Sequence, residues 1–154
     1  MALDAILFDF VKDYSAFNIA SLMAFFSNIT FVVVGFSALP VFREGRQATI
    51  DYFSLMITVI SFSIFFQQFF AIPRPALAAE LTYSFPSTHS SSAFAWAGFM
   101  GGKYKKYELI FYVFAVLVAV SRVYLGAHYP VDVIAGALLG WFAGKVITKA
   151  ERKH

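Results

Sequence analysis

Long apolar stretches separated by short polar ones run through most of the chain. They predict spanning helices at about 19–42, 51–72, 108–125 and 130–147, and a shorter helix at about 88–102. A membrane core about 30 Å thick needs about 20 helical residues, at about 1.5 Å per residue. The part of the short helix that follows His89 rises only about 20 Å, so we expect His89 to lie below the membrane surface, inside the bundle.

The first 17 residues show a different pattern. Apolar residues recur there at helical spacing, while acidic residues and Lys12 fall largely on the other side. This pattern predicts an amphipathic helix that lies at the membrane interface; the alternative is a poorly ordered terminus. The segment lacks a basic start and a small-residue cleavage site, so we do not expect a cleaved signal peptide.

Composition supports an all-α integral membrane protein with about five transmembrane helices. The chain has 154 residues, of which 60% are hydrophobic and only 14% are charged, against roughly 25% charged residues in a soluble domain. We therefore expect one membrane-embedded domain over residues 1–154. A net charge of +3, with scattered basic residues, does not suggest nucleic acid as a partner. The absence of cysteine excludes disulfides and thiolate metal sites.

Basic residues orient the predicted helices in the membrane. Nine of the twelve lie near helix ends on one side of the bundle: Arg43, Arg46, Lys103, Lys105, Lys106, Lys145, Lys149, Arg152 and Lys153. The positive-inside rule makes this side cytoplasmic, as in a bacterial inner membrane. Counting the spans then places the N-terminal helix and the segments 73–88 and 122–132 together on the outer, periplasmic face.

These two outer segments bring polar and ionisable residues to one end of the bundle: Arg74, Ser87, His89, Arg122, His128 and Asp132. Such groups are costly at the edge of hydrocarbon and usually serve a function. Two arginines can hold an anion through planar, bidentate hydrogen bonds. A helix that starts at Ser87 also favours an anion through its free N–H groups. The sequence therefore predicts a phosphate site.

The two histidines could carry out phosphoryl transfer. A covalent mechanism needs a nucleophile and an acid that protonates the leaving oxygen. Asp132, four residues after His128 at a helix start, is placed to hold one ring nitrogen and leave the other free to attack. A metal site is the competing use of two histidines and one carboxylate, but two converging arginines would repel a cation.

The motifs in this region resemble those of the type 2 phosphatidic acid phosphatase superfamily. That family includes bacterial membrane lipid phosphatases and shares its site with vanadium haloperoxidases. Its pattern is a lysine separated by six residues from Arg-Pro, then Pro-Ser-Gly-His, then Ser-Arg, five residues, His, three residues and Asp. This chain has Arg74-Pro75, Pro86-Ser87-Thr88-His89, and Ser121-Arg122 with His128 and Asp132 at the full spacing.

The resemblance implies a role for each matching residue. His128 would attack phosphorus and become phosphohistidine, and Asp132 would orient it. His89 would protonate the leaving lipid oxygen and then activate water. The phosphate oxygens would be held by nearby N–H groups and by Arg74, Arg122 and Ser87. The resemblance implies no metal and no cofactor.

Two positions depart from the family pattern. Thr88 stands where the motif has glycine, and Gln67 stands where it has lysine. Glutamine can donate a hydrogen bond but brings no charge. We expect Thr88 and Gln67 to join the phosphate-binding residues; alternatively, Gln67 merely packs between helices. Catalysis should survive, because neither the attack nor the proton transfers use position 67.

The sequence thus predicts a metal-independent lipid phosphatase similar to lipid A 1-phosphatases. The resemblance implies a lipid phosphate as substrate, such as lipid A 1-phosphate or phosphatidylglycerol phosphate. Undecaprenyl diphosphate hydrolysis is an alternative, as are a non-hydrolytic lipid-phosphate binder or transporter and a vanadium haloperoxidase. The pattern does not reveal the oligomeric state.

Overall fold

A computed structural model describes residues 17–75 and 82–151. The predicted N-terminal interfacial helix lies almost entirely outside these residues. The described chain is helical, and its elements are α2 (Phe17–Phe36), α3 (Ala38–Arg43), α4 (Arg46–Phe70), α5 (Thr88–Lys103), the 3-10 turn η1 (Lys105–Tyr107), α6 (Glu108–Tyr124) and α7 (Pro130–Glu151).

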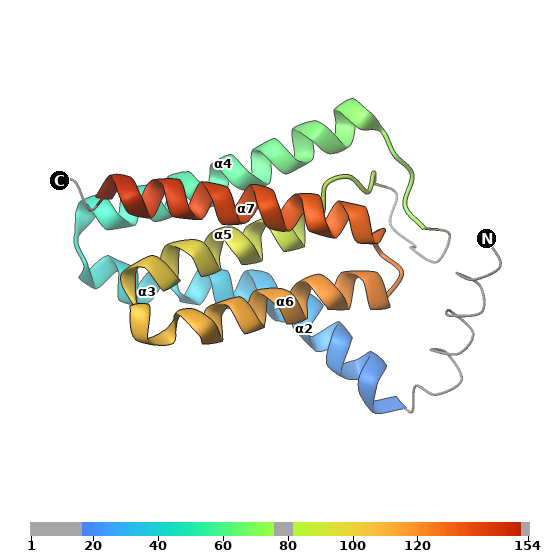
Figure 1. Ribbon diagram of the computed structural model, residues 1–154, viewed down its shortest axis with the longest axis horizontal. Coiled ribbons are helices and arrows are strands. Elements are labelled where there is room, and N and C mark those ends of the chain that lie inside the picture. Colours follow the sequence, from blue (N-terminus) through green and yellow to red (C-terminus); the bar gives the residue numbers. More distant parts are fainter. Residues whose placement is uncertain (1–16, 76–81, 152–154) are drawn as a thin grey trace.

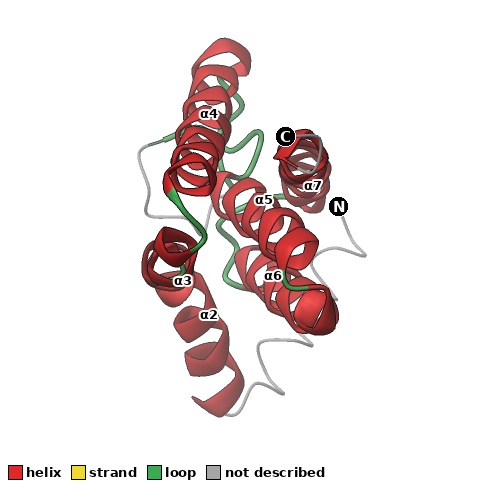
Figure 2. Ribbon diagram, turned by 90° about the vertical axis from the view of Figure 1, so that its left-hand side faces the viewer, coloured by secondary structure: helices red, strands yellow, loops and turns green. Residues whose placement is uncertain are grey.

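Helix α5 is the centre of the bundle. It is surrounded by α4, α6 and α7, while α2 and α3 lie on its remaining side (Figures 1 and 2). Its side chains are mostly small, and almost all of those from Ser90 to Gly102 are buried. Small residues allow close helix approach, which is how helices associate where no water drives them together.

The most extensive contact in the bundle is between α5 and α7. Gly136, Gly140 and Gly144 recur every four residues, so they form one stripe along α7. A Cβ atom added at Gly140 would lie 2.0 Å from the carbonyl oxygen of Ser91, and one at Gly144 would lie 2.5 Å from that of Ala95. The glycines of this stripe let the α5 backbone rest directly on α7.

Gly140→Ala should therefore lower the thermal midpoint of the protein in detergent. The added methyl group meets backbone atoms, which cannot rotate away, and forcing helices apart typically costs about 1–3 kcal/mol. The matched control is Gly35→Ala in α2, where an added Cβ has no atom within 4 Å. That control should leave the midpoint unchanged or raise it slightly, because alanine favours helix over glycine. Equal midpoints for the two variants would contradict this account of the α5–α7 contact.

The outer surface of the bundle is suited to lipid. Four described segments are long and apolar enough to cross a membrane: Ile19–Arg43, Arg46–Phe70, Lys105–Tyr124 and Pro130–Lys149. Large apolar side chains cover them, and Phe36 and Phe69 are each 69% exposed. The central helix α5 has 16 residues, so it is short, as predicted. This is an integral membrane protein.

The predicted first span is interrupted. Instead of one helix over 19–42, α2 ends at Phe36 and α3 begins at Ala38. The carbonyl of Val34 accepts hydrogen bonds from the side chains of Ser37 and Tyr52, and Trp96 donates to the Ser37 hydroxyl at 2.8 Å. Pro40 has no N–H for the carbonyl four residues before it. The diverted carbonyl and the missing donor together explain the break.

The boundaries of two other helices also differ from the prediction. Helix α4 starts five residues before position 51, because its first turn is helical but polar, with Gln47 donating to Asp51 at 2.9 Å. It ends at Phe70, before the prolines, because Ala71 adopts a left-handed conformation with a φ of 49°. Helix α7 continues to Glu151 rather than ending near position 147.

Candidate active site

The two polar segments meet at one end of the bundle, where α4 and α6 end and α5 and α7 begin (Figure 1). The basic residues Arg43, Arg46 and Lys103 lie at or near helix ends on the opposite end. A backbone hydrogen bond joins the segments directly, from the N–H of Ser87 to the carbonyl of Asp132 at 3.0 Å. The prediction that both segments share one side is therefore confirmed.

The start of α7 fixes Asp132. Pro130 is the first residue of the helix, where its missing N–H is harmless. Asp132 is two residues further on, and its Oδ2 atom accepts a hydrogen bond from the backbone N–H of Tyr129 at 2.9 Å. A carboxylate in the first turn that binds back to the preceding N–H stabilises a helix start. The helix cap thus determines where this buried carboxylate lies.

The end of α6 fixes His128. Gly126 has a φ of +65°, a conformation that glycine adopts easily and that commonly ends a helix. The chain then folds back, and the carbonyl of Arg122 accepts hydrogen bonds from the N–H groups of Ala127 and His128, at 3.0 and 3.2 Å. This reversal of the chain after α6 explains the spacing of five residues between Arg122 and His128.

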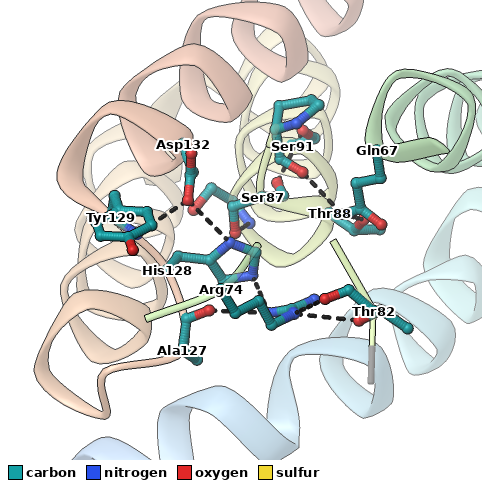
Figure 3. A network of polar contacts seen from close by, with 12 residues as sticks. Gln67, Arg74, Thr82, Ser87, Thr88, Ser91, Ala127, His128, Tyr129 and Asp132 are labelled. Carbon is teal, nitrogen blue, oxygen red and sulfur yellow. Dashed lines mark hydrogen bonds and ion pairs between the residues drawn. The ribbon is translucent and has the colours of Figure 1, made fainter. Parts of the chain in front are cut away.

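The imidazole of His128 lies between a cation and a carboxylate (Figure 3). Its Nε2 atom is 2.9 Å from Nη1 of Arg74, and its Nδ1 atom is 3.6 Å from Oδ2 of Asp132. Arginine can only donate, so Nε2 is the acceptor and the proton of the neutral ring is on Nδ1, toward the carboxylate. The lone pair of Nε2 therefore points toward the guanidinium of Arg74.

Arg74 is held in this position by the two segments. Its Nε atom donates to the carbonyl and the hydroxyl of Thr82, at 3.2 and 3.1 Å, and its Nη1 atom donates to the carbonyl of Ala127 at 2.9 Å. Figure 3 shows the guanidinium lying beneath the His128 ring between these partners. Arg74 thus connects the loop after α4 to the loop before α7.

The environment keeps His128 uncharged. Burial lowers the pKa of His128 to about 3, and the positive charges of Arg74 and Arg122 act in the same direction. An imidazole with a pKa this low is neutral at physiological pH. The lone pair of Nε2 here accepts the hydrogen bond from Arg74, and it can act as a nucleophile when that bond is broken.

This low pKa should make stability depend on pH. In the unfolded chain His128 takes up a proton near its ordinary pKa of 6.5, whereas in the folded protein it does so only near 3. The unfolded state thus binds more protons as the pH falls below 6.5, which destabilises the fold by up to about 3 kcal/mol near pH 4.5.

The measurement is the thermal midpoint of wild type and His128→Asn in detergent between about pH 7 and pH 4.5. The midpoint of the wild type should fall more steeply, because the variant lacks the titrating ring. Parallel curves would show that His128 is not buried in its neutral form.

Arg122 and His89 lie within electrostatic reach of His128, since both lower its pKa. Arg122 is buried, and its guanidinium donates to the hydroxyl of Ser27 on α2. His89, the second residue of α5, is half-buried and packs against Phe31 of α2, with ring centroids 4.8 Å apart. The histidine therefore lies on the side of α5 that faces α2.

Ser87, Thr88 and Gln67 form the side of the site next to α4. Ser87 caps α5, as predicted, and its hydroxyl accepts from the N–H of Ser90. Gln67 is buried, and its amide nitrogen donates to the carbonyl of Pro86 at 2.8 Å and to the hydroxyl of Thr88 at 3.0 Å. The two residues that depart from the family pattern are thus in contact.

Three serine and threonine residues that the sequence analysis did not single out also shape the site. Thr82 holds Arg74, Ser27 holds Arg122, and the fully buried Ser84 influences the pKa of His128 through its backbone. Thr82 and Ser84 lie just before Pro86, and their position next to this motif could have identified them as candidate site residues. Ser27 had a weaker signal, as a polar residue inside an apolar span.

Comparison with protein families identifies a match over much of the chain. A family model described as the PAP2 superfamily matches residues 48–154 of this chain. That range contains Gln67, both polar segments and helices α5 to α7.

Individual proteins are similar over shorter regions. The Bacillus licheniformis protein named bacitracin transport permease protein BcrC is 38% identical over 77 residues, which are 49% of this chain and 38% of that protein. A lipid A 1-phosphatase of Rhizobium etli is 43% identical over 61 residues, which are 39% of this chain and 26% of that protein. The chain thus spans less than two fifths of the length of either relative.

The fold is also that of a solved structure. The crystal structure of a transmembrane PAP2-type phosphatidylglycerolphosphate phosphatase from Bacillus subtilis superposes with a TM-score of 0.76. The superposition covers 99% of this chain and 87% of the other, at 24% sequence identity. The likeness at this identity concerns the fold.

Proposed function

Since this chain belongs to the PAP2 superfamily, we propose that it is a lipid phosphatase, a phosphoric monoester hydrolase that works without a metal or cofactor. One observation carries the proposal: a cationic Arg74 lies 2.9 Å from the nucleophilic nitrogen of a buried, neutral His128. A cation beside a nucleophile attracts an electrophile that carries negative charge, and a phosphate ester is one.

In the first step, Nε2 of His128 attacks phosphorus as the bond between phosphorus and the lipid oxygen breaks. The leaving oxygen takes a proton from His89. The ring of His128 becomes cationic, and Asp132 stabilises this charge across Nδ1. Arg74, Arg122 and the N–H groups at the start of α5 neutralise the phosphoryl oxygens.

In the second step, water attacks the phosphorus of phosphohistidine, and His89 accepts a proton from it. The bond between phosphorus and Nε2 breaks, inorganic phosphate leaves, and the neutral imidazole is restored. His89 thus acts first as acid and then as base, two roles that an imidazole can combine. Its place beside Phe31 is consistent with a leaving group that extends into lipid.

The substrate is a phosphorylated lipid of the outer leaflet, such as lipid A 1-phosphate, phosphatidylglycerol phosphate or a related lipid. Two observations support this: α5 starts inside the bundle, and apolar side chains surround it. With Gln67 in place of a lysine, the site has one cation fewer, which favours a monophosphate over undecaprenyl diphosphate. The basic residues at the opposite end support a bacterial inner-membrane protein, acting as one domain over residues 1–154, whose site faces the periplasm.

Release of inorganic phosphate from a panel of lipid phosphates tests the proposal. We expect turnover that is unaffected by a chelator and inhibited by vanadate, which resembles five-coordinate phosphorus. Loss of turnover in chelator, restored by magnesium, would contradict metal independence. Binding of lipid phosphates without phosphate release would instead favour the binder or transporter alternative, to which the name of the Bacillus licheniformis relative also points.

A further inference from the structure

Gln67 and Thr88 are 21 residues apart and belong to different helices, yet they form a direct hydrogen bond of 3.0 Å. They are also the positions where the phosphate-binding motifs of this chain lack the family's lysine and glycine. Gln67 is only 7% exposed, so its side chain is held inside the bundle. Two departures from one pattern that contact each other suggest a joint role.

The hydrogen bonds of Gln67 exclude direct phosphate binding by its amide nitrogen. An amide nitrogen has two N–H donors, and here one points to the carbonyl of Pro86 and the other to the hydroxyl of Thr88. The Pro86 carbonyl can only accept, which fixes the orientation of the amide. The remaining atom of the amide is its oxygen, which would repel a phosphate oxygen.

The hydroxyl of Thr88 is oriented by this contact. It accepts a hydrogen bond from Gln67, so its own proton must point elsewhere. Within residues 17–75 and 82–151, that proton has no hydrogen-bond acceptor. Thr88 is the first residue of α5, between the cap Ser87 and His89, where the free N–H groups of the helix also point.

We propose that Gln67 and Thr88 act as one unit, in which Gln67 orients the Thr88 hydroxyl as a neutral donor to a phosphoryl oxygen. Thr88 is then the residue that contacts the substrate, and Gln67 is a positioning residue. Where the family pattern has a cationic lysine, this pair provides a neutral hydroxyl with a fixed orientation. This inference rests on the proposed function, because it assumes that a phosphoryl group binds at the start of α5.

A double-mutant cycle tests the unit. Thr88→Val keeps the shape of the side chain and removes the hydroxyl, while Gln67→Met keeps the length and removes the donors. Thr88→Val removes a hydrogen bond to a charged group, and Gln67→Met leaves the hydroxyl that makes this bond without its orienting partner. We therefore expect each variant to lower kcat/KM and the affinity for orthovanadate by about 10-fold or more. The loss in the double variant should be clearly smaller than the product of the two single losses, because both changes weaken the same hydrogen bond to the phosphoryl group. The bond from Gln67 to the Pro86 carbonyl is lost only in the variants that carry Gln67→Met.

Two further variants separate positioning from simple damage to the fold. Thr88→Ser restores a hydroxyl and should recover most of the activity and vanadate affinity. Gln68→Met is the matched control, since Gln68 is the exposed neighbour of Gln67 and should change neither quantity. If Thr88→Val does not fold, Thr88→Gly, the residue of the family motif, takes its place in the cycle.

The results distinguish this inference from the proposed function. Losses that multiply in the double variant, or no rescue by serine, would overturn the pairing even if the enzyme hydrolyses lipid phosphates. If the wild type binds vanadate but hydrolyses no lipid phosphate, the proposed function fails, and the cycle on vanadate affinity still decides the pairing. Unchanged vanadate affinity in Thr88→Val would show that its hydroxyl is not a phosphate donor.

Discussion

His128→Ala should abolish turnover, with a loss on the order of 10⁵-fold or more, because it removes the nucleophile. The structure supports this size of effect: the ring is buried, neutral and aligned on both sides by Arg74 and Asp132. The measurement is phosphate release from a lipid phosphate and from an aryl phosphate. The matched control is His154→Ala, which changes the terminal histidine and should leave turnover unchanged.

Trapping the covalent intermediate makes the prediction about His128 specific. His89→Ala removes the acid, so an aryl phosphate, whose leaving group needs little protonation, should suffer less than a lipid phosphate in the first step. The variant also lacks the base that activates water, so phosphohistidine should accumulate. After a quench, acid-labile, base-stable phosphate should be found on His89→Ala and not on the double variant that also carries His128→Ala. Label that persists on the double variant would place the nucleophile elsewhere.

Asp132→Asn should slow turnover by about 10³–10⁴-fold and leave the fold intact; in a serine protease the equivalent change costs about 10⁴. The amide oxygen of asparagine can still accept the hydrogen bond from the N–H of Tyr129 that caps α7. It has no negative charge, however, and cannot stabilise the cationic ring that forms on phosphorylation. The effect should therefore appear in kcat, with little change in the thermal midpoint.

Asp132→Ala provides the comparison that separates catalysis from capping. It removes the charge and also the acceptor for Tyr129, so it should lower the thermal midpoint by the equivalent of about 1 kcal/mol in addition to slowing turnover. If Asp132→Asn retained the kcat of the wild type, Asp132 would have only the structural role at the start of α7.

Local features in the sequence were sufficient for much of the fold. The apolar stretches predicted the helices, and Ser87 and Pro130 marked two helix starts. These features depend on residues within a few turns of one another, and helical periodicity records them directly. Counting spans was also enough to bring the segments with Arg74 and His128 to one end.

The same reasoning was less accurate where polar groups act on the backbone. The break at Ser37 depends on Tyr52 and Trp96, which reach it from α4 and α5. The early start of α4 depends on a polar first turn that the apolar pattern does not include. Both errors have one cause: hydrophobicity locates a span, whereas hydrogen bonds determine where its helix begins, breaks or ends.

The chemistry was predictable by residue type and motif spacing, but its geometry was decided only by the tertiary structure. The sequence identified two histidines, two arginines and an aspartate that suit phosphoryl transfer. It could not show that Arg74 faces Nε2 of His128, 54 residues away in the chain, or that Gln67 donates to Thr88. Those contacts depend on how closely α4, α5 and α7 approach, and the α5–α7 distance depends in turn on the glycines of α7. Contacts between helices carry no periodic signal along the chain, so only the packed bundle determines them.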